Sequence, residues 1–218
     1  MIHSLEIDSI FLEYGLKKVL QNVYIKSETG KATGLLGRNG AGKSCLLKIV
    51  FGELDAGNKS VRIDGKPILH DYRKPDDLRY LPQRRFIPGF LRLNRIFKDF
   101  NLDFNDFINE FPDFEKYYKT RIKNLSGGER RIVEIYMILV AKTKFCILDE
   151  PFSQIMPLHI EIIKKLILRE KQYKGIIITD HLYQDIIDVC NNIYVLKNGK
   201  THIVYSLRDL EILEYINA

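Results

Sequence analysis

The first glycine-rich turn of the chain carries the residue types of a phosphate-binding loop. It reads Gly37-Arg38-Asn39-Gly40-Ala41-Gly42-Lys43-Ser44 and fits the pattern G-x-x-x-x-G-K-[ST]. In such a loop the backbone N–H groups point at phosphate oxygens, and the positive end of the following helix adds to the attraction. We therefore predict that Lys43 reaches the β- and γ-phosphates of a nucleotide and that Ser44 holds Mg²⁺.

Two acids, Asp149 and Glu150, directly follow the apolar run at residues 145–148. Such a run is typical of a central parallel strand, whose carboxyl end faces the crevice where ligands bind. There Asp149 can orient Mg²⁺ through its water shell, and Glu150 can polarise an attacking water. Strands that end in solvated acids are common, so the pair gains its weight from lying downstream of a phosphate loop.

Three further side chains join this set by their positions. His181 follows the apolar run at residues 176–178, where it can hold a γ-phosphate and a water in line. Gln83 follows a predicted strand that ends near Pro82, and from there it can touch the metal and sense the γ-phosphate. Tyr14 precedes the phosphate loop and can stack on adenine, although a surface or core role is the default for any one of the 12 tyrosines.

A second glycine-rich turn, Leu125-Ser126-Gly127-Gly128-Glu129, precedes a predicted apolar helix at residues 130–140. Ser126, Gly127 and Gly128 at a helix start form a second anion-binding N-terminus. One triphosphate does not need two such turns from one chain. We therefore expect this turn to cap a nucleotide held by another copy or by a sister subunit. The alternative is an ordinary helix cap with a flexible lead-in.

These residues need an α/β scaffold to bring them together. Strands alternate with helices along the chain, which predicts a mostly parallel sheet, with antiparallel strands gathered toward the N-terminus. At residues 84–144 aromatic residues are frequent and the patterning is helical. We therefore predict one domain, residues 1–218, with a core lobe at 1–83 and 145–218 and an inserted helical lobe at 84–144. Residues 207–218 are expected to form a helix.

Composition limits the class of protein. The chain has 218 residues, 45% of them hydrophobic, and a net charge of +6. The basic stretch at residues 84–98 fits either a solvated face or a partner-docking patch. The 3 cysteines lack close pairing, so we expect buried thiols in a reducing compartment. No apolar run reaches the ~18 residues that span a bilayer, so membrane contact is expected only through another chain.

The motifs, in this order, resemble those of the nucleotide-binding subunit of an ATP-binding cassette (ABC) transporter. Residues 37–44 resemble its Walker A motif, 125–129 its LSGGE signature and 145–149 its Walker B strand. On this resemblance the predicted catalytic residues are Glu150, His181 and Gln83, and the predicted metal ligands are Ser44, Gln83 and Asp149. The predicted nucleotide-binding residues are Tyr14, Gly37, Arg38, Asn39, Gly40, Ala41, Gly42, Lys43, Ser44, Cys45, Ser126, Gly127 and Gly128.

The resemblance also implies a fold, partners and a mechanism. The fold is a P-loop NTPase core with an N-terminal antiparallel β lobe and an inserted helical lobe. Two ABC ATPase subunits, identical or different, close head to tail over two ATP molecules with Mg²⁺, and hydrolysis reopens the pair. Transmembrane permease subunits receive the motion through the region after Gln83, which implies a cytoplasmic protein at the inner face of the cell membrane. Short stretches are most similar to the lipopolysaccharide-export and branched-chain amino-acid groups.

Five residues depart from the family pattern. Met156 stands where an Asp is usual, in a loop to which the resemblance assigns coupling of the two sites, so hydrolysis is expected to be slow or to need a partner. Tyr136-Met137 replace Ala-Arg, and Arg38 and Cys45 replace Pro and Thr. Two alternative functions stay open: a soluble ABC-type ATPase acting on nucleic acid or ribosomes, and a hydrolysis-poor regulatory cassette. A single cassette without an extension speaks against the first, so nucleic acid is not expected as a partner.

Overall fold

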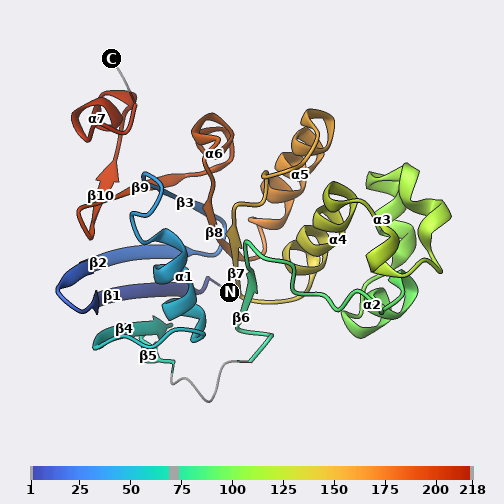
Figure 1. Ribbon diagram of the computed structural model, residues 1–218, viewed down its shortest axis with the longest axis horizontal. Helices are drawn as coiled ribbons and strands as arrows, with labels where there is room; N and C mark the ends of the chain where they lie inside the picture. Colours follow the sequence, from blue (N-terminus) through green and yellow to red (C-terminus); the bar gives the residue numbers. More distant parts are fainter. Residues whose placement is uncertain (1, 69–73, 217–218) are drawn as a thin grey trace.

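The structure, a computed structural model, describes residues 2–68 and 74–216 and holds two β-sheets with helices around them (Figure 1). The smaller sheet has four antiparallel strands in the order β2-β1-β4-β5. The strands are β1 Ser4–Tyr14, β2 Lys17–Glu28, β4 Asn58–Ile63 and β5 Lys66–Pro67. The expected antiparallel lobe near the N-terminus is therefore present, built around the β1–β2 hairpin.

The larger sheet has six strands in the order β10-β9-β3-β8-β7-β6, and all neighbours except β10 and β9 run parallel. The strands β3, β7 and β8 are buried at every position because both faces of the sheet are covered. Neighbouring residues enter opposite cores: Cys146 and Leu148 lie in one, Ile147 in the other. The strands are β3 Ala32–Leu36, β6 Leu78–Leu81, β7 Phe145–Asp149, β8 Gly175–Thr179, β9 Asn192–Lys197 and β10 Lys200–Val204.

The helices cover both faces of the larger sheet. Helix α1, Lys43–Phe51, packs in the core shared with the antiparallel sheet, and the others lie toward the second core (Figure 1). The remaining helices are α2 Leu93–Asp99, α3 Phe104–Glu110, α4 Gly127–Val140, α5 Pro157–Glu170, α6 Tyr183–Val189 and α7 Leu207–Ile212, with 3-10 turns at Pro112–Tyr117 and Ile122–Asn124. Within the described residues, none of these helices has the length and apolar character to cross a bilayer.

An aromatic cluster holds the segment between β6 and β7 together. The ring of Phe107 lies 5.2 Å from Phe97, 5.0 Å from Phe114 and 4.8 Å from Tyr136, measured between centroids. Tyr136, on α4, thus fills a space between helices that a smaller side chain such as Ala would leave empty. The same hydrophobic core continues from this segment onto the larger sheet. The division of the chain at residues 84 and 144 stays a prediction.

Two expectations are wrong in part. The helix expected at residues 207–218 is only α7, Leu207–Ile212; the chain then turns, with Glu214 in the left-handed region, and residues 217–218 lie outside the described part. Of the three free thiols only Cys146 is fully buried, and burial raises its pKa to about 12. Cys45 and Cys190 are half-buried as residues, although burial also raises the pKa of the Cys190 thiol to about 12.

Candidate nucleotide-binding site

The first glycine-rich turn connects β3 to α1, as a phosphate-binding loop must. Gly42 has a φ of 106°, and a Cβ there would lie 3.0 Å from the Val19 Cγ1 atom. At Gly37 a Cβ would lie 2.8 Å from the carbonyl oxygen of Leu196. Both positions therefore need glycine, one for its backbone angle and one for its close approach. The turn leaves the N-terminus of α1 facing the carboxyl edge of the larger sheet.

Lys43 lies folded against this loop. Its Nζ donates to the carbonyl oxygens of Gly37 at 2.6 Å and Arg38 at 3.3 Å, and the residue is only 6% exposed. Burial lowers the pKa of Lys43, against the opposing effect of nearby Glu150 and Asp149. An ammonium has three N–H donors, and two carbonyls leave one for a phosphate oxygen. A negative ligand beside Lys43 would offset the cost of burying its charge.

Ser44 and Asp149 supply oxygen atoms suited to Mg²⁺. The Ser44 hydroxyl donates to Asp149 Oδ1 at 3.3 Å, and Tyr80 donates to Oδ2 at 3.1 Å. Burial raises the pKa of Asp149, so a cation would stabilise its charged form. Mg²⁺ is commonly held by one or two carboxylates together with water and substrate phosphates. Across residues 2–68 and 74–216 no cluster of three acidic, His or Cys side chains is placed to hold a metal ion.

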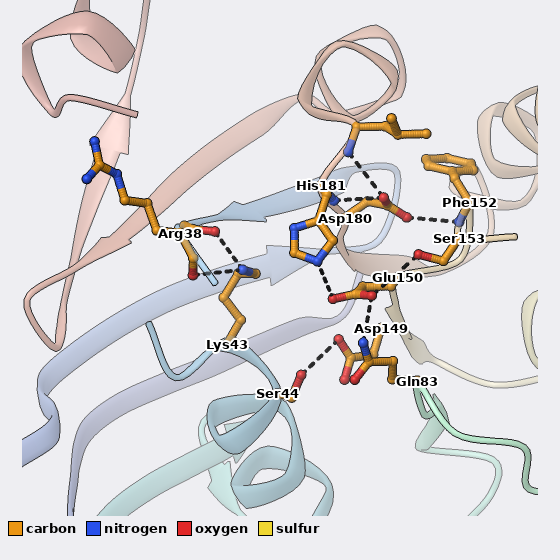
Figure 2. Close-up of polar contacts among 12 residues, drawn as sticks. Arg38, Lys43, Ser44, Gln83, Asp149, Glu150, Phe152, Ser153, Asp180 and His181 are labelled. Atoms are coloured by element: carbon orange, nitrogen blue, oxygen red, sulfur yellow. Dashed lines mark hydrogen bonds and ion pairs between the residues drawn. The ribbon is translucent and has the colours of Figure 1, made fainter. Parts of the chain in front are cut away.

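Glu150 is the meeting point of the strand-end residues (Figure 2). His181 Nε2 lies 2.7 Å from its Oε1, and Gln83 Nε2 donates to its Oε2 at 2.7 Å. Ser153 donates to the same Oε2 at 3.4 Å. Glu150 itself has a φ of 52°, a left-handed conformation that is uncommon outside glycine and clusters at functional sites. The structure thus brings together three residues that the sequence placed after three different strands.

Two residues that the sequence analysis did not single out fix the loops of this site. Asp180 accepts hydrogen bonds from the backbone N–H groups of Phe152, His181 and Leu182, at 2.9, 2.7 and 3.2 Å (Figure 2). It therefore ties the loop after Glu150 to the loop that carries His181. Burial raises the pKa of Asp180. Its position beside His181, at the end of an apolar strand, was the only available signal.

The second of these residues is Arg131 on α4. Its guanidinium donates to the carbonyl oxygens of Pro82 at 2.7 Å, Asp149 at 2.7 Å and Glu150 at 3.1 Å. One side chain thus joins the loop of Gln83, the end of β7 and the helix after the second glycine-rich turn. The sequence signal for this role was an Arg within a predicted apolar helix. In the structure Arg131 is buried, and a buried charge without partners would be costly.

The second glycine-rich turn lies away from the first within one chain. Ser126 caps α4, accepting from the Glu129 N–H at 3.2 Å, while Glu129 accepts from the Ser126 N–H at 2.7 Å. A Cβ on Gly128 would lie 3.0 Å from the Gln154 carbonyl oxygen. Figure 1 shows α4 and α1 well separated, with β6 and β7 between them. Ser126 thus caps its own helix, which both interpretations of the turn allow, and binding to a second subunit stays a prediction.

A cavity of about 460 Å³ opens beside the first turn and suits the non-phosphate part of a nucleotide. Its lining includes residues 38–41 of the loop and residues 17–19 of β2. Tyr14 is 55% exposed at the tip of the β1–β2 hairpin. It does not line the cavity itself, but its cross-strand partner Lys17 does. Adenine stacking by Tyr14 stays a prediction, as does a ligand contact by Cys45.

Known proteins show the same arrangement of sequence and fold. The family model described as ABC transporter matches residues 20–153. The lipopolysaccharide export system ATP-binding protein LptB of Haemophilus influenzae is 34% identical over 211 residues, covering 88% of this chain and 86% of that protein. The protein of the same name from Escherichia coli K12 is 34% identical over 220 residues, covering 92% and 89%.

A solved structure of the ATP-binding subunit of an ABC transporter matches with a TM-score of 0.80 and 22% identity, covering 97% of this chain and 93% of that one. This likeness supports the α/β P-loop NTPase fold that the sequence predicted. The relatives confirm the resemblance to the lipopolysaccharide-export group. Because the family model spans over half of the chain and these relatives cover most of it, the chain belongs to the ABC transporter family, as an ATP-binding subunit with ATPase activity.

Proposed function

We propose that this chain hydrolyses ATP, with Mg²⁺, to drive transport through separate transmembrane permease subunits. The observation that carries the proposal is the set of contacts on one carboxylate, where Gln83 and His181 each lie 2.7 Å from Glu150. Burial lowers the pKa of Lys43, and Glu150 is close enough to oppose that shift, so the phosphate loop and this carboxylate belong to one site. Such a site suits the transfer of a terminal phosphate to water.

Each residue has a role that follows from its chemistry. Lys43 and the backbone N–H groups before α1 bind the triphosphate, and Ser44 and Asp149 would hold Mg²⁺, which when bound neutralises charge on the phosphates. Glu150 accepts a proton from the attacking water. Gln83 and His181 contact both oxygens of Glu150. A γ-phosphate offers these two side chains another partner and so frees Glu150 for water.

The separation of the two glycine-rich turns supports a site shared between two subunits. The N-terminus of α4 presents Gly127 and Gly128 and carries the positive end of a 14-residue helix. It lies too far from α1 of its own chain to complete that site (Figure 1). We infer that two ATPase subunits, identical or different, pair head to tail, and that permease subunits dock near residues 84–98. The protein then works in the cytoplasm, at the inner face of the cell membrane.

Phosphate release by the purified protein tests this proposal. Glu150→Gln should lower turnover by at least about 100-fold, because it removes the proton acceptor, while ATP binding persists and dimers accumulate. Lys43→Ala should weaken ATP binding itself. Glu115→Gln, an exposed residue of the helical segment, is the matched control and should behave as the wild type. Unchanged turnover in Glu150→Gln would refute the role of Glu150 as proton acceptor. Light scattering in the presence of ATP measures the molecular mass and so detects the dimer.

Met156 favours a second candidate, a cassette that binds ATP and hydrolyses it poorly. The residue is 62% exposed at the start of α5, where a polar side chain could contact a second subunit. Under this alternative the protein binds ATP and dimerises, yet releases phosphate no faster than the Glu150→Gln variant. The same assay therefore separates the two candidates.

A further inference from the structure

The chain that follows α7 lies on the phosphate loop. The Arg38 guanidinium donates to the carbonyl oxygen of Glu214 at 2.8 Å, and Lys197 pairs with the Glu214 carboxylate at 2.8 Å. The backbone of Gly37 and the side chain of Tyr215 lie side by side. Figure 2 shows Arg38 pointing away from Lys43 and Glu150, toward the side of the loop where these contacts form. Residues 213–216 are thus joined to the loop by side-chain and backbone bonds.

This C-terminal segment, residues 213–216, also reaches the helix that follows His181. The ring of Tyr215 meets the ring of Tyr183 edge to face, with centroids 6.2 Å apart, and Tyr183 is the first residue of α6. Glu214 has a φ of 55°, a left-handed angle that persists only where surrounding contacts hold it. The bonds from Arg38 and Lys197 are such contacts. The conformation of the segment is therefore set by the nucleotide site.

The segment forms one wall of the cavity beside the loop. Leu213, Glu214 and Tyr215 face residues 38–41 and residues 17–19 across a space of about 460 Å³. The phosphate end of a nucleotide is fixed on the other side, because Lys43 and the Ser44–Asp149 pair lie toward β7. The base and ribose must then leave the loop toward residues 38–41. The cavity volume falls in the range of about 300–1,000 Å³ usual for small-ligand sites.

We propose that residues 213–216 form the nucleoside-facing wall of the nucleotide site and that Arg38 holds this wall in place. The proposal rests on the proposed function, because it requires that a nucleotide binds at this loop. Under this proposal Arg38, which departs from the family pattern, is a positioning residue. Its guanidinium holds the C-terminal segment through the carbonyl oxygen of Glu214. The apolar faces of Leu213 and Tyr215 offer packing to a base, and Lys17 and Glu214 offer polar partners to a ribose.

Two ligands that share a triphosphate but differ in the nucleoside test the wall. Calorimetric titration with MgATP and with magnesium tripolyphosphate gives a dissociation constant for each. Tyr215→Ala, and a chain ending after Ile212, should raise the dissociation constant for MgATP about fivefold or more, as loss of one good contact does. Both should bind tripolyphosphate within about twofold of the wild type, since no residue of the phosphate loop is replaced and Lys43 keeps its own contacts with Gly37 and Arg38. Glu211→Gln, exposed on α7, is the matched control with unchanged binding.

The other outcomes overturn the proposal. Equal weakening of both ligands would show that the segment only supports the shape of the phosphate loop, and no weakening of either would show that it does not contribute to binding. Retained tripolyphosphate binding also reports that a variant is folded. If the wild-type protein bound neither ligand, the proposed function would fail, and that result is distinct from a failure confined to the variants.

Discussion

Met156 leaves the N-terminus of α5 without a side-chain cap, and Met156→Asp should therefore stabilise the protein. The helix begins at Pro157, and its first turn contains no acidic residue. Met156 has a φ of −69° and a ψ of 144°, the extended backbone that N-cap residues adopt, so Asp needs no rearrangement. Its carboxylate could accept a hydrogen bond from the N–H of Leu158 or His159.

The magnitude follows from two contributions. A side-chain cap is typically worth ~1 kcal/mol, and a negative charge at a helix N-terminus adds about 0.3–1 kcal/mol at an exposed position such as this one. Together they should raise the free energy of unfolding by about 1.5 kcal/mol. For a chain of this size each kcal/mol moves the melting temperature by about 2–4 °C, so we expect a rise of about 3–6 °C.

Thermal unfolding followed by circular dichroism tests this value. Met156→Asn supplies a cap without a charge and should give the smaller rise, while Met156→Ala supplies neither. Added salt should reduce the advantage of Asp over Asn, because it screens the interaction with the helix dipole. If the Asp variant melted no higher than the Ala variant, the reasoning about the uncapped helix would be refuted. Phosphate release by the same variants shows whether the missing Asp also slows hydrolysis.

Two further predictions concern the buried charges of the site. Arg131→Met removes three hydrogen bonds from a charged group to carbonyl oxygens, while Glu134 keeps its closer ion pair with Arg130. The loss of these bonds should cost about 3–5 kcal/mol of unfolding free energy and lower turnover. Arg131→Lys should restore little, because an ammonium lacks the fork that reaches both loops; full rescue by Lys would contradict this. For Asp149, burial raises the pKa, so the folded protein without nucleotide binds that proton more tightly than the unfolded chain does. Its free energy of unfolding should then fall as pH rises from about 4 through the raised pKa. Asp149→Asn should lessen this fall and melt higher at neutral pH, and a steeper fall in the variant would argue against the burial effect.

The sequence was sufficient to predict those site residues that come directly after a strand. Glu150 and His181 each come after an apolar run, and parallel strands end at one edge of a sheet, so their meeting needed no knowledge of distant contacts. The register confirms the logic, since Leu148 pairs with Ile178 and Asp149 with Thr179. Gln83 joined them for the same reason, through β6. The parallel topology carries this information, and it can be inferred from apolar runs alone.

Residues that act through backbone atoms were not predictable in the same way. Arg131 bonds to three carbonyl groups and Asp180 to three N–H groups, and any residue can offer those partners. Neither belongs to a spacing pattern that identifies a chemical reaction. Burial is the property that distinguishes them, since both are less than 10% exposed in the folded chain. A charged residue next to or inside an apolar segment is the sequence feature that indicates a side chain bonded to backbone atoms in the interior.

The C-terminal segment shows the opposite limit, where a local pattern predicts the wrong structure. Residues after Leu207 carry apolar side chains at helical spacing, which predicted a helix to the end of the chain. The helix instead ends at Ile212, and Glu214 adopts a left-handed angle while bonded to Arg38, 176 residues earlier. A helix continued through Glu214 would carry its carbonyl out of reach of that guanidinium and Tyr215 away from Gly37. The contact with the phosphate loop therefore decides the conformation of residues 213–216. A pattern read from neighbouring residues in the sequence cannot include that contact.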